Sequence, residues 1–505
     1  MSMQTSSDIC IIGGGISGLY LALRLKRSAP QLRIQLFEAL EAVGGRVQTE
    51  PMLSGQFRAE FGAVRIEPDL QPLMDQFVQQ LGIATSAITS HEACSAIRPD
   101  LTRLTPAERA VAEQAAGGDV AWALLWHGIA QVIGAQWPLA SDHLERPARA
   151  EEKASFRRLA QFGGRPLYQQ GMWNVLSEVL SHEAVEFTRE KGAFYNFKNQ
   201  NPNAADWICQ LLDMRLMQRP SYIPQGGMQA LIDAAEQAVR AAGVDIHVRH
   251  QLLAFGERAD GALDLQLLHD GERVTLRTRR LILALPRSAL EALAPSLPAP
   301  VQASLDAVLC FPIVWASCVM ADPWWSPGTP PGSGEGATTR AAHFESHPEQ
   351  PEAYGLAMFY NDDPWCHYWA NLTDTPGARF PHKGRPVHSS DERLRQALVR
   401  TLQQTFGRDD EPQLLEWGLC DWSAAPFGAG VHFWKPGRDS EQVMRTLAAF
   451  ALGDDGRAPQ VHICGEAYSD FQGFFEGALR SAQRVLQALP AYATSSHQGS
   501  DHECH

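Results

Sequence analysis

The first forty residues alternate between short apolar runs and an apolar helical face. Residues 9–12 predict a short buried strand, and residues 33–37 predict a second one. Between them, the apolar residues from 19 to 25 recur with the 3.6-residue period of a helix. This strand–helix–strand order is typical of a βαβ unit, whose two strands run parallel. The chain therefore begins as an α/β domain.

Two further regions have different patterns. Residues 71–221 predict a helical domain, because four segments follow the helical period: LMDQFVQQL, PAERAVAEQAA, ASFRRLAQF and WNVLSEVLSHEAVEF. Residues 300–440 alternate short strands with turns rich in Gly and Pro, such as SPGTPPGSGEGATT, and predict a mixed sheet. The end of the chain is rich in Ser, Gly and His, and we expect a disordered tail over residues 491–505.

Glycines after the first predicted strand indicate a dinucleotide site. Gly13, Gly15 and Gly18 have the GxGxxG spacing, and Glu38 follows the second predicted strand. Gly13 allows a tight turn, Gly15 lets a pyrophosphate approach the backbone, and Gly18 lets the helix lie close to the strand. The helix N-terminus favours phosphates, and Glu38 would accept hydrogen bonds from a ribose diol. A GxGxxG alone is weak evidence, but the strand, the helix and the acid together predict a Rossmann-like dinucleotide-binding domain.

Composition narrows the classes of partner. The chain has 505 residues, 45% of them hydrophobic, and a formal net charge of −14. An acidic chain without a basic run is not typical of nucleic-acid binding, so we expect no such partner. No apolar stretch approaches the roughly 18 residues of a membrane span, and we expect a cytoplasmic protein without a membrane partner. The nine cysteines are scattered without a CxxC pair, which favours buried thiols, and we expect no metal site.

Three separated motifs resemble the flavin-containing amine oxidase family. Gly44, Gly45 and Arg46 follow the second strand in EAVGGRVQTE, as does that family's second glycine motif, whose arginine lies near the FAD phosphates. VHICGEAYSDFQGFFEGALRSAQ resembles the family's closing motif. YIPQGGMQALIDAAEQAVRAAGVDIHVRHQLLAF and LILALPRSAL resemble the middle of its FAD domain. The resemblance implies FAD as the cofactor. It also implies a discontinuous FAD-binding domain over residues 1–70, 222–299 and 441–490, beside a helical domain (71–221) and a substrate-binding domain (300–440).

The resemblance also implies which residues contact FAD. Glu466 would lie at the ribityl or phosphate region, Leu252 at the adenine, and Ala284 and Pro286 close to the flavin. Relatives with covalent FAD carry a cysteine just before the last helix; FQGFFEG has none, so we expect non-covalent FAD. The full set of expected cofactor-binding residues is Gly13, Gly15, Ile16, Ser17, Gly18, Glu38, Ala39, Gly44, Gly45, Arg46, Ala63, Val64, Arg65, Leu252, Ala284, Pro286, Trp422, Gly465, Glu466, Gly473, Phe474 and Phe475.

One arginine stands in an apolar stretch, AEFGAVRIEP. A guanidinium stays charged at any usable pH, so Arg65 needs the surface, a protein acid or an incoming anion. The stretch resembles a segment of the L-amino acid oxidases of this family, in which the arginine binds the α-carboxylate of the substrate. The alternative is a structural ion pair between Arg65 and Glu67 or Glu60.

For the L-amino acid oxidase branch, the resemblance implies oxidative deamination. Hydride would pass from Cα to flavin N5, and an L-amino acid and O2 would become a 2-oxo acid, ammonia and hydrogen peroxide. Phe474 would flank the reacting amine and keep water away from it. Met172, Tyr360 and Asp362 would line the substrate pocket with Arg65. Trp173, Asn174 and His432 are weaker candidates, for which core packing is the commoner outcome. Dimers are common among such relatives, and the oligomeric state stays open.

The chain departs from the family at Trp315. Family members usually carry a lysine there, which holds a water at flavin N5 and helps the reduced flavin to meet oxygen. Three positions are therefore expected at the reacting centre: Arg65, Trp315 and Phe474. The alternatives to an oxidase are an amide-forming amino acid 2-monooxygenase and a polyamine or monoamine oxidase. A flavoprotein without turnover is a further alternative, against which the FAD motifs and the carboxylate clamp argue.

Overall fold

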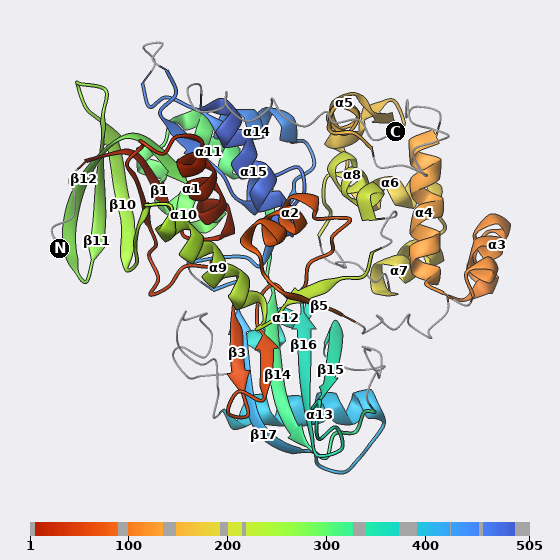
Figure 1. Ribbon diagram of the computed structural model, residues 1–505. Coiled ribbons are helices and arrows are strands. Elements are labelled where there is room, and N and C mark those ends of the chain that lie inside the picture. Colours follow the sequence, from red (N-terminus) through yellow and green to blue (C-terminus); the bar gives the residue numbers. More distant parts are fainter. Residues whose placement is uncertain are drawn as a thin grey trace, which may run out of the picture.

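The computed structural model describes residues 6–88, 99–116, 118–134, 148–191, 200–214, 219–326, 339–372, 391–424, 426–453 and 458–489. These residues form three lobes (Figure 1), one around a large sheet, one of helices and one around a smaller sheet. Cys94, Cys504, the tail from residue 491 and residues 327–338 of the Gly/Pro-rich loop lie outside the described residues.

The large sheet is built around β1 (Ser6–Ile12). Its parallel part has the order β9-β2-β1-β12-β19, and Ile11 pairs with Leu36 on one side and Ile282 on the other. The predicted βαβ start is confirmed, because α1 (Ile16–Ser28) connects β1 to β2. The further strands are β2 (Ile34–Phe37), β9 (Asp245–His247), β12 (Glu272–Leu283) and β19 (Val461–Ile463), and β10 (His250–Glu257) and β11 (Leu263–His269) extend β12 as an antiparallel meander.

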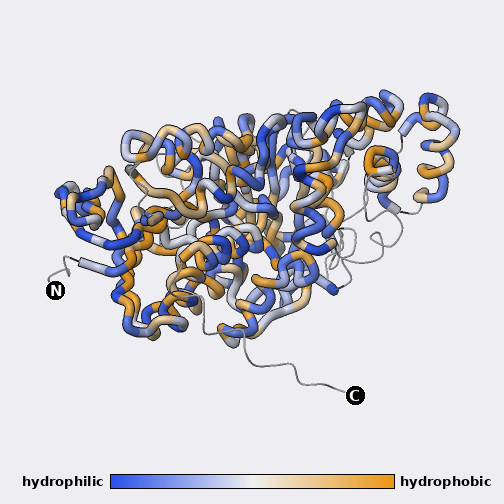
Figure 2. The backbone as a smooth tube through the Cα atoms, turned by 90° about the horizontal axis from the view of Figure 1, so that it is seen from above, coloured by the Kyte–Doolittle hydropathy of each residue, from blue (hydrophilic) through white to orange (hydrophobic). Residues whose placement is uncertain are grey.

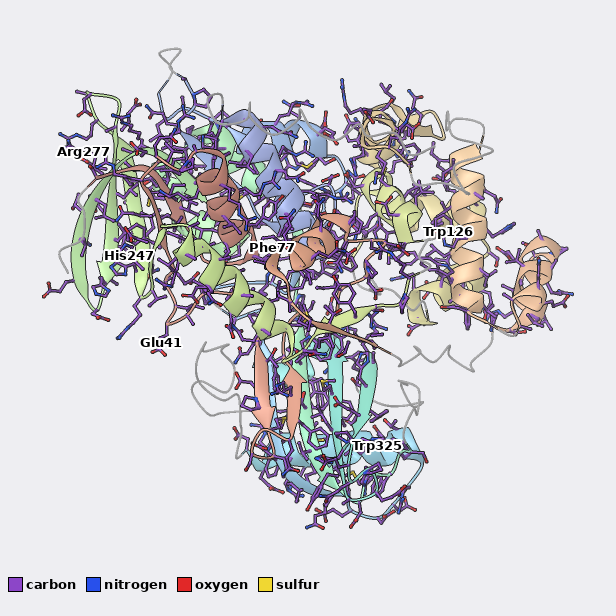
Figure 3. All side chains as sticks on the ribbon, viewed as in Figure 1. Glu41, Phe77, Trp126, His247, Arg277 and Trp325 are labelled. Atoms are coloured by element: carbon purple, nitrogen blue, oxygen red, sulfur yellow. The ribbon has the colours of Figure 1, made fainter. Side chains whose placement is uncertain are left out.

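Helices from distant parts of the chain cover this sheet. α1 packs against α9 (Met228–Ala241) and α15 (Phe475–Ala488), and α2 (Pro72–Leu81) packs against the same two helices. Phe77 of α2, labelled in Figure 3, contacts Tyr20 of α1 edge to face with ring centroids 5.2 Å apart. The Glu476 carboxylate accepts hydrogen bonds from the first N–H groups of α2, at Leu73 and Met74. The shorter helices of this lobe are α10 (Arg287–Ala292), α11 (Ala299–Leu305) and α14 (Ser440–Ala448).

The smaller sheet is antiparallel, in the order β15-β16-β14-β17. Side chains alternate across β14, so Val314 and Ala316 pack with α13, whereas Trp315 and Val319 face the opposite side. A hairpin of β3 and β4 lies beside β16 in the same lobe (Figure 1). The elements are β14 (Val314–Ala321), β15 (Ala341–Ser346), β16 (Tyr354–Asn361), β17 (Gln413–Asp421), α12 (Trp365–Ala370), α13 (Glu392–Phe406), β3 (Thr49–Met52) and β4 (Phe57–Glu60).

The helical lobe differs in detail from its prediction. WNVLSEVLSHEAVEF forms two helices, because the Ser181 N–H bonds to the distant Glu108 carboxylate and the Ser181 hydroxyl accepts from the Ala184 N–H. ASFRRLAQF ends as a helix at Leu159, and a short strand follows. The helices are α3 (Pro106–Gln114), α4 (Val120–Ile133), α5 (Ala150–Leu159), α6 (Met172–Val179), α7 (His182–Lys191) and α8 (Ala204–Met214).

The α/β fold class is confirmed, and the domain limits stay a prediction. In Figure 2 hydrophobic and hydrophilic residues intersperse along the helices, as expected of elements with one buried face. Within the described part of the chain, no helix is both long and apolar enough to cross a bilayer.

A buried arginine joins the helical lobe to the large-sheet lobe. Arg157 of α5 is 3% exposed, and its guanidinium forms ion pairs with Asp206 of α8 and Glu441 of α14, both at 3.0 Å. A third bond runs from Arg157 to the Asp470 carbonyl. Because a buried charge is costly without partners, these bonds fix α5 and α8 against α14.

Replacing Arg157 with Met should therefore destabilise the protein strongly. The change removes the counter-charge of the buried Asp206 and leaves Glu441 with only the more distant Arg484, at 3.7 Å, which costs about 3–5 kcal/mol. Arg149→Met is the matched control, because Arg149 pairs with Glu152 on the surface with 72% of its side chain exposed. The control should cost under about 1 kcal/mol. Urea unfolding followed by circular dichroism measures both, and equal losses would contradict the prediction.

Candidate flavin and substrate site

The predicted glycine turn forms at the end of β1. Gly13 has a φ of +105° and its N–H bonds to the Phe37 carbonyl, so the chain turns sharply between β1 and α1. A Cβ on Gly18 would lie 2.1 Å from the Gly13 carbonyl oxygen, so α1 approaches the turn too closely for any side chain. A Cβ on Gly15 would meet only the Gly45 backbone, 3.9 Å away. The surface at Gly15 is therefore clear of side chains, as close approach by a phosphate requires.

The N-terminus of α1 beside this turn suits an anion. Its N-cap residue is Gly15, no side chain caps the helix, and its first turn contains no acid. The first N–H groups of a helix lack intrahelical partners and carry a partial positive charge. Ile16 and Ser17, both expected to contact FAD, are the first two residues of this helix.

Glu38 lies directly across the turn. Its carboxylate accepts hydrogen bonds from the Gly14 N–H at 2.7 Å and from the Leu40 N–H at 2.9 Å, which fix its orientation beside Ala39. The main chain of Glu38 bonds to that of His247 and His250. Glu38 thus connects the glycine turn to the β9–β10 connection, and Leu252 lies on β10 two residues beyond His250.

Arg46 and Glu466 form the charged centre of the site. Arg46 Nη2 lies 2.9 Å from Glu466 Oε2, and Arg46 Nη1 bonds to the Gly430 carbonyl. Glu466 also accepts from the His432 N–H at 3.0 Å, from His432 Nδ1 at 2.9 Å and from the Gly473 N–H at 2.7 Å. Burial raises the pKa of the Glu466 carboxyl, but Arg46 and His432 outweigh that effect and lower it to about 2. Glu466 therefore stays ionised.

The Arg65 segment packs against this centre. The Ala63 N–H bonds to the Arg46 carbonyl, and the Trp422 indole N–H donates to the Phe61 carbonyl at 2.5 Å. A Cβ on Gly62 would lie 2.4 Å from the Arg46 carbonyl oxygen, so the two backbones are in direct contact. The residues that precede Arg65 are thus held between Arg46 and Trp422.

Arg65 itself pairs with an acid on its own segment. Arg65 Nε lies 2.5 Å from Glu67 Oε1, and the exposed fractions of the two side chains are 27% and 13%. Of the two structural partners considered for Arg65, Glu67 is therefore in contact. Glu60 accepts from the Met228 N–H, at the start of α9, and from the Thr49 hydroxyl.

Several predicted pocket residues belong to one apolar cluster. Trp315 and Met172 are buried in it, and Tyr360, Phe474 and Val64 pack against it with part of their surface exposed. Trp315 stacks edge to face on Tyr360 across the β14–β16 pair, with ring centroids 5.2 Å apart. Phe474 is the N-cap residue of α15 and follows Gly473, so Phe475 begins the helix.

Asp362 has a partner within the protein. It is 4% exposed, and Arg340 Nε lies 2.9 Å from its Oδ1. Burial raises the pKa of the Asp362 carboxyl to about 6, although Arg340 opposes the rise. A cationic substrate group would have to share this carboxylate with Arg340, so the role of Asp362 in substrate binding stays a prediction that this contact does not favour.

The remaining predicted residues lie around the same turn. A Cβ on Gly13 would lie 2.3 Å from the Ala284 carbonyl oxygen, and the Ala284 N–H bonds to the Ile12 carbonyl. Pro286 is the N-cap residue of α10. The Gly44 N–H bonds to the Gly14 carbonyl, which joins the two glycine motifs. Gly430, which contributes its backbone carbonyl, lies in DWSAAPFGAGVHFWKPG, a stretch that resembles bacterial amino acid oxidases, but it is not among the predicted site residues, and His432 is a weaker candidate.

These residues fit FAD. An uncapped helix N-terminus and a bare glycine backbone suit the pyrophosphate, an oriented carboxylate at Glu38 suits a ribose, and Arg46 brings a guanidinium beside Glu466. We infer that the glycine turn, Glu38, Arg46 and Glu466 would hold the cofactor, with Gly473 and the start of α15 beside them.

Alanine at two of the glycines should separate cofactor binding from folding. Gly15→Ala has room for its methyl group, so the apo-protein should keep its stability to within about 0.5 kcal/mol. Its FAD affinity should fall roughly tenfold, because the methyl group occupies the approach to the backbone. Gly18→Ala collides with the Gly13 carbonyl, so its apo-protein should itself unfold at a lower temperature. FAD titration and thermal unfolding measure both variants, and unchanged affinity in Gly15→Ala would contradict the prediction.

Comparison with known proteins agrees with this geometry. The family model described as flavin containing amine oxidoreductase matches residues 16–489. Aplysianin-A of Aplysia kurodai is 22% identical over 520 residues, which cover 95% of this chain and 89% of that protein. Wild-type putrescine oxidase bound to putrescine has a TM-score of 0.62 at 18% identity, covering 96% of this chain and 98% of the other. A variant of putrescine oxidase redesigned in its cofactor binding also has a TM-score of 0.62, at 17% identity, covering 96% and 99%.

At these identities the solved structures show a shared fold. The family model spans nearly the whole chain, including the glycine turn from Ile16 on, Arg46 and Glu466. At the level of the family, the activity is FAD-dependent oxidation of an amine or amino acid. The chain belongs to the flavin-containing amine oxidoreductase family.

Proposed function

We propose that the protein oxidises an L-amino acid to the 2-oxo acid, with release of ammonia and hydrogen peroxide. Bound FAD would supply the acceptor for the hydride that leaves Cα. The observation that carries the proposal is the position of Arg65, on a segment whose backbone contacts Arg46 and Trp422. A guanidinium on a segment that contacts the expected cofactor-binding residues suits the α-carboxylate of an amino acid.

The chain's own residues would bind and orient the substrate. Arg65 would take the carboxylate, and Glu67 would hold the guanidinium in one orientation through its bond to Nε. Phe474 and Tyr360 would exclude water from the reacting amine, since both pack on the apolar cluster that contains Trp315. Correct orientation of the reacting bond supplies a large share of the rate in reactions of this type.

A second candidate is an oxidase of amines that lack a carboxylate. The Arg65–Glu67 pair supports it, because Arg65 already has an acid within the protein. In that case Arg65 would be a structural residue, and the substrate would be bound by the apolar walls alone.

Substitution of Arg65 separates the two candidates. Arg65→Gln should lower kcat/KM for L-amino acids at least about 30-fold, because losing a charge-paired contact costs 2 kcal/mol or more. The corresponding amine without the carboxylate should react at an unchanged rate. The measurement is bleaching of the flavin absorbance under anaerobic conditions, over a panel of L- and D-amino acids and amines.

The matched control is Glu67→Gln, which removes the ion pair and keeps the cation. It should retain activity on L-amino acids to within about threefold, since a partly exposed pair contributes under about 1 kcal/mol. If only carboxylate-free amines bleach the flavin, or if Arg65→Gln slows both substrate classes equally, the protein is not an L-amino acid oxidase. Release of an amide in place of peroxide would identify a 2-monooxygenase.

Substitution of Trp315 tests how the reduced enzyme meets oxygen. Trp315→Lys would place a cation on the same face of β14, where it could stabilise the negative charge that oxygen acquires on reduction. We expect the second-order rate constant for reoxidation by O2 to rise by about tenfold or more, which is about 1.4 kcal/mol of transition-state stabilisation. Stopped-flow mixing of the reduced enzyme with O2 measures it. Trp315→Phe, which retains an aromatic ring without charge, should not increase the rate constant.

A further inference from the structure

Cys310, which is not among the predicted site residues, faces His432 across a two-stranded sheet. Cys310 lies on β13 (Val308–Phe311) and pairs in register with His432 on the antiparallel β18 (Val431–Trp434). Residues directly opposite in an antiparallel pair have their side chains on the same face, about 5 Å apart at Cβ. The thiol of Cys310 and the imidazole of His432 are therefore neighbours.

The imidazole of His432 is held from its other side. His432 is fully buried, and its Nδ1 lies 2.9 Å from Glu466 Oε2, so the ring orientation is fixed. Its buried Nε2 makes no regular hydrogen bond within the described part of the chain. A thiol, an imidazole and a carboxylate thus follow one another in a Cys–His–Glu series, the arrangement that activates a cysteine.

Charge at this site favours a thiolate. Burial raises the pKa of the Cys310 thiol, but His432 and then Arg287 of α10 outweigh it, and the net pKa lies below the ordinary thiol value. Burial lowers the pKa of His432, but the Glu466 charge and Cys310 outweigh it, and the net pKa is raised. The other groups that act on the pair are Glu291 of α10, which opposes the thiolate, and Arg46, which opposes the imidazolium.

The other described cysteines have a different environment. Cys310 is partly exposed, whereas Cys10, Cys209, Cys318, Cys366, Cys420 and Cys464 are all buried. Burial raises the thiol pKa of five of these six, with values of about 12 for Cys209, Cys318, Cys366 and Cys464. Reactive cysteines are accessible and lie beside cations, so Cys310 alone among these seven meets both conditions.

We propose that Cys310 is an oxidative modification site, at which hydrogen peroxide converts the thiolate to a sulfenic acid beside the FAD pocket. The thiolate sulfur attacks one peroxide oxygen, a sulfur–oxygen bond forms and the oxygen–oxygen bond breaks. Sulfur loses two electrons, and the departing hydroxide takes a proton to become water. The His432 imidazolium can supply that proton from its Nε2.

Oxidation of Cys310 would alter the charges around the residues that we expect to bind FAD. Glu466 Oε2 accepts from both His432 Nδ1 and Arg46 Nη2, so loss of the thiolate charge changes the balance on a carboxylate that we expect to contact FAD. The supply of peroxide by the enzyme itself rests on the proposed oxidase function. Added peroxide tests Cys310 whether or not the enzyme is an oxidase.

The first test is the pH dependence of alkylation in the wild-type holoenzyme. Iodoacetamide labelling, resolved by peptide mass spectrometry, should modify Cys310 with a midpoint below the ordinary thiol pKa of about 8.5. It should also label Cys310 at least tenfold faster at pH 7 than any of the six buried cysteines. A midpoint at or above the ordinary thiol pKa would overturn the proposal.

The second test removes the imidazole. His432→Gln should slow alkylation of Cys310 at pH 7 by about tenfold, equivalent to a rise of one pKa unit, and move the midpoint to higher pH. His462→Gln is the matched control, because His462 is equally buried and bonds through Nδ1 to the Ala448 carbonyl. Equal labelling of Cys310 in wild type and His432→Gln would show that His432 does not activate it.

The third test detects the product. Holoenzyme treated with hydrogen peroxide and then with dimedone, which traps sulfenic acids, should carry the adduct at Cys310, and Cys310→Ser should lack it. The oxidised wild-type protein should release FAD faster than the untreated one, whereas peroxide should leave the release rate of Cys310→Ser unchanged. An adduct elsewhere and none at Cys310 would refute the proposal even if the enzyme proves to be an oxidase.

Discussion

The site depends on one buried anion. Glu466 bonds to Arg46, to the backbone and ring of His432, and to the Gly473 N–H, so three segments distant in sequence meet at a single carboxylate. A buried carboxylate is tolerated only when its charge and lone pairs are satisfied. The contacts therefore depend on one another. Moving Arg46 would leave the buried Glu466 carboxylate without its main counter-charge, and moving Gly473 would displace Phe474 at the start of α15. This constraint joins the expected phosphate end of the cofactor site to its flavin end.

The parts that could be read from the sequence are those fixed by local geometry. Gly13 and Gly18 have their roles within one turn, so the GxGxxG spacing predicted both the tight turn and the close approach of α1. The Arg65–Glu67 ion pair could also be considered from the sequence, because its two residues are only two positions apart. The break between α6 and α7 was missed because the Ser181 N–H is bonded by Glu108, from another helix. The Cys310–His432 pair likewise follows from strand register, which no local pattern reports.

The Arg65–Glu67 pair does not exclude a carboxylate-binding role. Both side chains keep some exposure, and pairs of this kind contribute little because water competes for each charge. An incoming carboxylate would therefore displace or share a weak partner and need not break a strong one. Arg157 provides the contrast, since it is 3% exposed and its two acidic partners are 9% exposed, which leaves little room for exchange. A guanidinium oriented by a nearby acid and still partly exposed is suited to bind a second anion.

Strand alternation limits how the chain can compensate for Trp315. The neighbours of Trp315 on β14, Val314 and Ala316, face α13, so a cation at either position would point away from the candidate site. β14 itself contains neither Lys nor Arg. The positive charge nearest the expected flavin end must therefore come from other elements, namely Arg46 and the N-terminus of α15. Arg46 is already balanced by Glu466, so it is the N-terminus of α15 and the partly exposed Arg65 that retain positive charge for an incoming anion.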